Sequence, residues 1–116
     1  MDISRNKISY IGGIKLWKAI KRNSSITHLN LEKNPLESNG LSGMVDAMID
    51  NCRLKYLNMS YCELGHGGLK QVGEALIKNY TLKELVISNN YADDIGAKRF
   101  AVGLAKNHGL ELLDLS

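Results

Sequence analysis

The sequence contains few of the residues that divide, cross-link or anchor a polypeptide. It has one proline, Pro35, and no low-complexity linker, so nothing in its composition separates it into domains. No apolar run approaches the roughly 18 residues that a membrane span needs. The opening residues, MDISRNKISYIGG, lack the apolar core of a signal peptide. These absences favour one globular unit of 116 residues that has no membrane partner.

Cysteine, histidine and net charge are also scarce. The two cysteines, Cys52 and Cys62, are too few for a disulfide scaffold, so we expect reduced thiols and a cytoplasmic location. Together with three histidines they form no metal-ligand spacing, and no glycine-rich loop is followed by Lys-Ser or Lys-Thr. We therefore expect neither a metal nor a cofactor. A net charge of +3 does not by itself indicate nucleic acid or membrane.

A fixed repeat period is the dominant feature of the sequence. Apolar, glycine and asparagine positions recur about every 28 residues, which is the signature of a repeat architecture. The best columns are Leu29, Leu57, Leu85 and Leu113; then Gly12, Gly40, Gly68 and Gly96; then Asn23, Asn51, Asn79 and Asn107.

Each period begins with alternating apolar residues and continues at helical spacing, which predicts one short strand and one helix. We expect helices over about residues 11–22, 39–51, 67–78 and 94–106. Buried amides of Asn34 and Asn90 would bond the turn of their own repeat and that of the next, with Cys62 replacing Asn once. Ser38 and Asp94 occupy expected helix-cap positions. The asparagines at the helix ends are expected in the left-handed conformation.

This pattern resembles the leucine-rich repeat family, in particular its ribonuclease-inhibitor-like subtype, whose motif is LxxLxLxxNxLxxxGxxxLxxxLxxN. The matching stretches are ITHLNLEKNPLESNGLSGMVDAMIDN, LKYLNMSYCELGHGGLKQVGEALIKN and LKELVISNNYADDIGAKRFAVGLAKN. The resemblance implies an α/β solenoid, a right-handed βα superhelix with a parallel sheet on the concave face and helices on the convex face. The array would cover residues 1–116, with repeats at 26–53, 54–81 and 82–109 and partial repeats at 1–25 and 110–116.

Both ends of the sequence fall inside an expected strand. Met1 stands at a core leucine position, and Ser116 follows directly after another strand. Such ends expose strand edges and core side chains. We expect either a segment of a longer repeat chain or end-to-end association between copies.

Side chains between the core leucines should face the concave surface. Because neighbouring strands lie about 4.8 Å apart, equivalent residues form rows across the sheet. Tyrosine and arginine are frequent anchors of protein interfaces, and acidic side chains add charge complementarity. The predicted contact residues are Arg5, Glu32, Lys33, Tyr56, Asn58, Tyr61, Glu63, Glu84 and Tyr91.

The predicted function is protein binding through this concave face, with no enzymatic activity. His28 and Ser60 are separated by four positions along the strand, roughly 13 Å, which is too far for a nucleophile and its base. The resemblance leaves two alternatives open: a regulatory segment of a Ran-type GTPase-activating protein, or a ligand-sensing segment of a NOD-like receptor. Lysines on the outer helix faces could touch nucleic acid, although a solubilising role explains them more simply.

Overall fold

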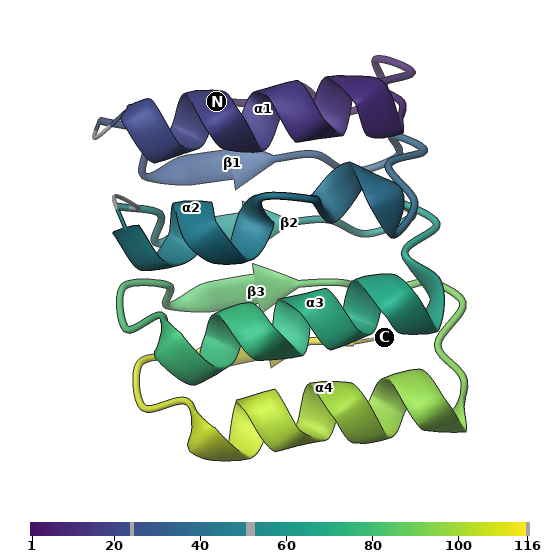
Figure 1. The fold of residues 1–116 in the computed structure, drawn as a ribbon, viewed down its shortest axis with the longest axis vertical. Helices are drawn as coiled ribbons and strands as arrows, with labels where there is room; N and C mark the ends of the chain where they lie inside the picture. Colours follow the sequence, from purple (N-terminus) through teal and green to yellow (C-terminus); the bar gives the residue numbers. More distant parts are fainter. Residues whose placement is uncertain (24, 51–52, 116) are drawn as a thin grey trace.

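Each full repeat folds into a short strand followed by a helix. The structure is a computed structural model that describes residues 1–23, 25–50 and 53–115. One sheet forms one layer and a row of helices covers one of its faces (Figure 1). The elements in chain order are α1 (Tyr10–Arg22), β1 (His28–Asn30), the 3₁₀-helix η1 (Asn39–Leu41), α2 (Met44–Asp50), β2 (Tyr56–Asn58), α3 (Gly65–Lys78), β3 (Glu84–Val86), α4 (Asp94–Lys106) and β4 (Leu112–Asp114).

The sheet confirms the register that the period predicts. Its strands are parallel in the order β1-β2-β3-β4, and equivalent residues of successive repeats pair, as in Leu29 beside Leu57 and Leu57 beside Leu85. Asp2 forms a further parallel bridge with Asn30. The leucines of this row point toward the helices, and Leu29, Leu57 and Leu85 have no exposed surface. A strand or a helix alone would expose its apolar face, so stacking the units creates the core.

Buried asparagine amides connect successive turns after the strands. Asn34 is fully buried; its Oδ1 accepts the N–H groups of Asn6 and Ile8, and its Nδ2 donates to the carbonyls of Ile3 and Leu31. The bonds therefore join each turn to the preceding repeat, not to the next one as expected. Every polar atom of the amide is used, which makes burial of this side chain favourable.

Cys62 occupies the equivalent place in the middle repeat. The Sγ atom of Cys62 donates to the carbonyl of Leu31 at 3.2 Å. The backbone N–H of Cys62 donates to Oδ1 of Asn90 at 2.8 Å. A thiol is a weak donor and a weak acceptor, and it cannot bond four backbone groups as an amide does. We call the series of bonds that these asparagines form between successive turns the asparagine ladder. Cys62 weakens this ladder between the repeats at 26–53 and 54–81.

The helices differ from the sequence expectation at their ends. Asp93, not Asp94, caps α4, because its Oδ1 accepts the N–H of Gly96 at 2.8 Å, and Ser38 makes no side-chain cap bond. The expected helix over 39–51 is divided into η1 and α2; Gly43 has φ +90°, and a Cβ built on it would lie 3.8 Å from Cβ of Trp17. Residue 51 lies outside the described part of the chain.

The asparagines that follow the helices are extended, not left-handed. The φ angles of Asn23, Asn79 and Asn107 are −100°, −90° and −78°. Their amides instead bond the loop: Oδ1 of Asn79 accepts N–H groups two and three residues ahead, and Nδ2 donates to the carbonyl of Met48 in the preceding repeat. A second asparagine ladder therefore runs along this edge of the sheet.

Two glycines allow α3 and α4 to pack backbone to backbone. A Cβ added to Gly103 would overlap the carbonyl of Gly73, and a Cβ added to Gly73 would come within 2.8 Å of the carbonyl of Arg99. Both glycines are buried in the middle of their helices. A side chain at either position must separate the two helices.

Substitution Gly103→Ala should therefore lower the free energy of unfolding by about 1–3 kcal/mol, although alanine favours helix more than glycine does. The matched control is Gly67→Ala in α3, where the added Cβ would meet only Ser38 at 3.2 Å. Urea unfolding followed by circular dichroism measures both variants. Equal stability of the two would contradict the packing described.

Candidate functional site

The sheet presents one face to the helices and leaves the other face open. We call the second surface the open sheet face; its first row is His28, Tyr56, Glu84 and Leu112, which are paired across β1 to β4. The rings of His28 and Tyr56 stack with centroids 5.9 Å apart and planes inclined by 19°. Tyr56 is half-buried, whereas Glu84 and Leu112 are exposed. The face thus begins with a fixed aromatic pair and continues into an acidic and an apolar residue.

The next rows of the open sheet face are more buried than the alternation predicts. Asn58 is 9% exposed, and its Oδ1 accepts the N–H of Ser60 at 2.9 Å. Ser60 is 2% exposed and its Oγ accepts the N–H of Ser88 at 3.0 Å. These side chains hold the start of the turn together. Of the predicted contact residues, Asn58 is therefore the one that offers a partner the least surface.

The turns that follow the strands hold a periodic set of non-glycine residues at positive φ. We call this region the strand-to-helix edge (residues 4–9, 32–38, 60–66 and 88–94). Five residues of the set were predicted as contact residues, and the other three, Lys7, Glu37 and Asn89, were not. The φ angles lie between 54° and 60° for Arg5, Lys7, Lys33, Glu37, Tyr61, Glu63, Asn89 and Tyr91. Pro35 breaks the regular spacing, because its ring holds φ at a negative value, about −65°.

This conformation is unusual for large side chains. A left-handed residue other than glycine costs roughly 1–2 kcal/mol, and glycine would avoid most of that cost. Strained backbone of this kind is concentrated at binding and catalytic sites, where it fixes the direction of a side chain. Here it holds Tyr61 and Tyr91 with 48% and 75% of their surface exposed.

Several contacts add to this arrangement. Lys33 Nζ lies 5.3 Å from the centroid of the Tyr61 ring, within range of a cation–π interaction. Glu37, Glu63, His66 and Tyr91 line a shallow hollow of about 390 Å³. The three predicted tyrosines therefore do not form one cluster: Tyr56 lies on the sheet with His28, Tyr61 lies beside Lys33, and Tyr91 borders this hollow. The remaining predicted residues, Arg5 and Glu32, are exposed and half-buried respectively.

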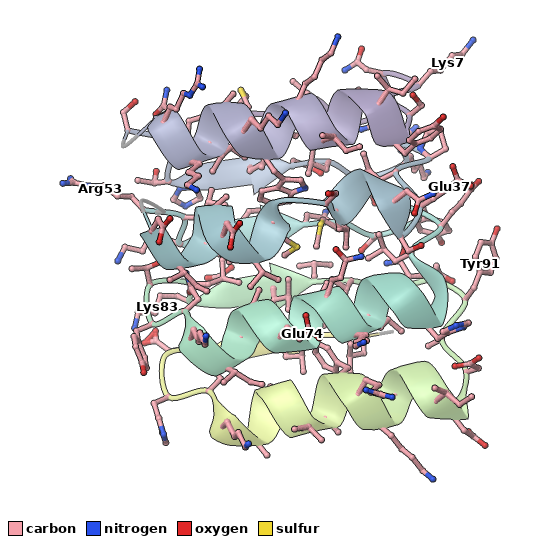
Figure 2. The ribbon with its side chains drawn as sticks, in the orientation of Figure 1. Lys7, Glu37, Arg53, Glu74, Lys83 and Tyr91 are labelled. Carbon is pink, nitrogen blue, oxygen red and sulfur yellow. The ribbon has the colours of Figure 1, made fainter. Side chains whose placement is uncertain are left out.

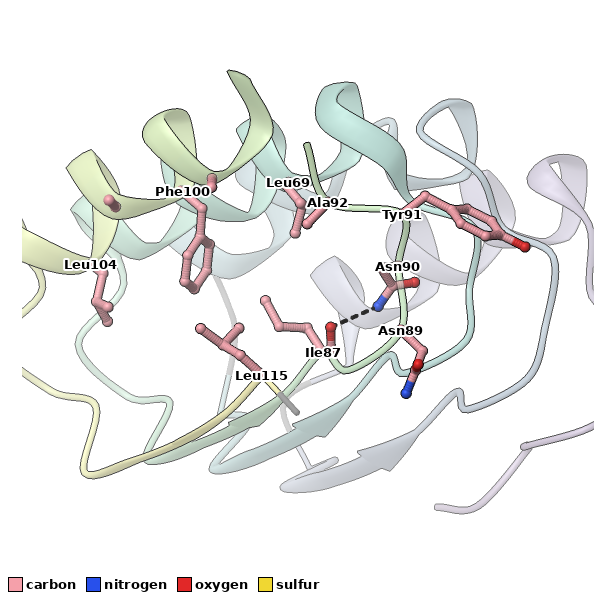
Figure 3. A pocket seen from close by; sticks show the side chains of 11 residues that line it. Leu69, Ile87, Asn89, Asn90, Tyr91, Ala92, Phe100, Leu104 and Leu115 are labelled. Carbon is pink, nitrogen blue, oxygen red and sulfur yellow. Dashed lines mark hydrogen bonds between the residues drawn. The ribbon is translucent and has the colours of Figure 1, made fainter. Parts of the chain in front are cut away.

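An apolar hollow lies between α4 and the sheet, beside β4. It has a volume of about 420 Å³ and an apolar lining that includes Leu69, Ile87, Phe100 and Leu104 (Figure 3). Leu115 reaches into it from the sheet and is 54% exposed, whereas the ring of Tyr91 points away. It is an uncovered part of the repeat core and has few polar groups that could orient a ligand.

The surroundings of Cys62 favour the neutral thiol over the thiolate. Burial raises its pKa to about 11, although the backbone N–H groups of Asn34 and Lys33 act in the opposite direction. Among the described residues, no group of three His, Cys, Asp or Glu side chains could hold a metal ion. Within the same residues, no helix is long and apolar enough to cross a membrane.

Comparison with known protein families agrees with the repeats found in the fold. The structure is an α/β repeat fold, with a parallel sheet covered by helices on one face. Residues 22–45 and 50–72 each match the family model described as Leucine Rich repeat, and the starts of the two matches differ by one repeat period. These matches support a leucine-rich repeat family for the chain. No curated protein matches the sequence.

Substitution Glu63→Gly should raise the free energy of unfolding by about 0.5–1 kcal/mol, because relief of the left-handed strain exceeds the extra chain entropy that glycine loses on folding. Glu84→Gly is the matched control: Glu84 is exposed on a strand, where glycine costs roughly 0.5–1 kcal/mol. Thermal and urea unfolding measure both. A loss of stability in Glu63→Gly as large as that in the control would show that the turn is not strained.

Stability should also fall as the pH rises from about 9 to about 11. The folded thiol of Cys62 has a pKa of about 11 against an ordinary value of 9.0, so the unfolded chain loses this proton first and is favoured increasingly above pH 9. The decrease due to this group is about 2–3 kcal/mol. Urea unfolding at several pH values measures it.

The variant Cys62→Asn separates this effect from the titration of lysines and tyrosines. It removes the thiol and restores the amide found at residues 34 and 90, so it should be more stable than the wild type at pH 7, by about 1 kcal/mol. Its stability should change less between pH 9 and 11. Parallel curves for the two proteins would contradict the raised pKa.

Proposed function

We propose that this chain is a protein-binding module whose contact surface combines the open sheet face with the strand-to-helix edge. Leucine-rich repeats generally mediate protein–protein interactions. The observation that carries the proposal is the set of non-glycine residues held at positive φ. Five of the nine contact residues predicted from the sequence belong to it, namely Arg5, Lys33, Tyr61, Glu63 and Tyr91.

The binding mechanism rests on preorganisation. Ordering a flexible side chain at an interface costs roughly 0.5–1.5 kcal/mol, and a surface that is already fixed avoids part of this cost. The stacked His28–Tyr56 pair and the Lys33–Tyr61 contact support such a surface. Glu32, Glu63 and Glu84 add negative charge around the exposed tyrosines, and Arg5 and Lys33 add positive charge at one end. The partner we expect is a protein whose surface places apolar groups against these separate tyrosines and charged groups of opposite sign against the carboxylates and cations.

The architecture we propose for the whole array is a right-handed βα solenoid of the ribonuclease-inhibitor-like subtype. The fixed sequence period and the alternation of strand and helix support it. The open sheet face would then line the concave side of the arc over residues 1–116. A cytoplasmic location belongs to the same proposal, and the buried thiol of Cys62 is compatible with it.

The double variant Tyr61→Ala/Tyr91→Ala should lose binding to natural partners while keeping its fold. Both tyrosines are exposed, and removal of interface anchors typically costs about 2 kcal/mol or more, which is about a 30-fold loss of affinity. Partners captured by the immobilised wild-type chain from an extract of the source cells are identified, purified and titrated against each variant.

The matched control is Lys15→Ala/Lys98→Ala, which removes two side chains from the outer faces of α1 and α4. Partners should bind this control as they bind the wild type. Loss of binding in the control alone, with the tyrosine variant unaffected, would place the contact surface on the helices and refute the proposal.

A further inference from the structure

The positive charge of the chain is concentrated on one edge of the molecule. We call the loops that lead from helices to strands the helix-to-strand edge; it consists of the described residues within 21–27, 50–55, 78–83 and 106–111. Seven basic and two acidic residues lie there, whereas the opposite, strand-to-helix edge has three basic and five acidic residues. The rest of the chain has equal numbers of the two signs. The helix-to-strand edge therefore carries a formal charge of +5 and the opposite edge −2, which together give the net charge of +3.

The structure brings the centre of this basic surface together from the three repeats at 26–53, 54–81 and 82–109. Arg53, Lys78 and Tyr80 line one hollow of about 220 Å³, and Asp50 also borders it. Lys55 and Lys83 come directly before the neighbouring strands β2 and β3, and the N–H of Lys83 donates to the carbonyl of Lys55 at 2.9 Å. Figure 2 shows Arg53 and Lys83 on one side of the molecule, with Lys7, Glu37 and Tyr91 on the other.

Most of these cations are available for a partner. Arg53, Lys55 and Lys78 are exposed, and in the described part of the chain none of them forms an ion pair. Lys83 is half-buried and its Nζ donates to the carbonyl of Gly109 at 3.2 Å, which fixes its position. Like charges on adjacent strands repel each other, and an anion placed between them relieves that repulsion. Tyr80, with 63% of its surface exposed, adds an apolar contact beside them.

Acidic residues limit the length of this basic surface. On one side Asp50 forms an ion pair with Lys21 at 3.3 Å, and on the other side Glu111 follows Lys83 in the strand row. Four cations thus lie between two carboxylates. A continuous phosphate backbone would have to pass these carboxylates, whereas a short run of carboxylate side chains fits between them. Arginine also pairs with carboxylates through two parallel hydrogen bonds.

We propose that the helix-to-strand edge binds a short acidic segment of a partner protein, through Arg53, Lys55, Lys78 and Lys83, with Tyr80 as an apolar contact. This surface lies on the opposite edge from Tyr61 and Tyr91. The inference therefore does not depend on the function proposed for the open sheet face, and substitutions on one surface should leave binding at the other unchanged.

The test uses a fluorescein-labelled peptide of six glutamates flanked by glycine and serine, titrated with the whole chain by fluorescence anisotropy at about 50 mM salt. The wild type should bind it, and binding should weaken at higher salt. The variant Arg53→Glu/Lys78→Glu should bind about tenfold or more weakly, because two attractive contacts become repulsive. Tyr61→Ala/Tyr91→Ala should bind as the wild type does.

The matched control is Lys15→Glu/Lys98→Glu, which makes the same change in net charge on the outer helix faces. It should bind the peptide within about twofold of the wild type, and circular dichroism confirms that every variant is folded. Equal losses in the edge variant and the control would show non-specific attraction and overturn the proposal. No binding by the wild type at this low salt concentration would also overturn it.

A labelled oligouridine with the same number of negative charges separates the two kinds of anionic partner. The proposal predicts that the glutamate peptide binds more tightly. Tighter binding of the oligouridine, lost in the edge variant, would assign this surface to nucleic acid and refute the acidic-peptide interpretation.

Discussion

The hydrogen bonding of buried asparagine amides determines how one repeat joins the next. A turn that leaves a strand and enters a helix has backbone N–H and C=O groups that no regular element bonds. Asn34 and Asn90 bond these groups from inside the fold, each in its own turn and in the preceding one. Asn79 and Asn107 do the same at the opposite edge of the sheet. Without these bonds, stacking would place unpaired polar groups in the core, at roughly 1–3 kcal/mol for each group.

The same constraint explains the surface that faces a partner. Asn34 and Asn90 are held inside the fold, so the side chains next to them must point outward. Lys33 and Tyr91 do so with the backbone at positive φ. The strain at those residues is offset by the bonds that close the turn. Preorganised side chains and a stable stack are therefore two results of one local geometry. Cys62 forms a weaker version of this connection in the middle of the molecule, between the turns that hold Lys33 and Tyr61.

The sequence was sufficient to predict the strand register, because the leucine period alone decides which residues pair. It was not sufficient for the turns. Positive φ was expected at Asn79 and its equivalents but occurs at Tyr61 and Tyr91, since backbone conformation here depends on how each turn closes against its neighbour. The division of the second helix at Gly43, where φ is +90°, is likewise something that the residue period does not report.

The candidate surfaces, too, were predictable from the sequence only in part. Alternation along the strand correctly placed Tyr56 and Glu84 on the open sheet face. It could not show that the amide of Asn58 bonds within its own turn and that the hydroxyl of Ser60 bonds the next turn. The basic helix-to-strand edge was present in the sequence as charges in successive loops. It becomes visible as one surface only in the fold, where the loops that lead from helices to strands lie on the same side of the molecule (Figure 1).

Amide hydrogen exchange measured by NMR tests the central claim that buried asparagines fix the turns. Oδ1 of Asn34 accepts the N–H of Ile8, so this amide should exchange slowly in the wild type, and the substitution Asn34→Ala should increase its exchange rate far more than that of Leu85 in β3. If the amide of Ile8 exchanges as fast in the wild type as in the variant, the turns are not held by this ladder and the account is wrong.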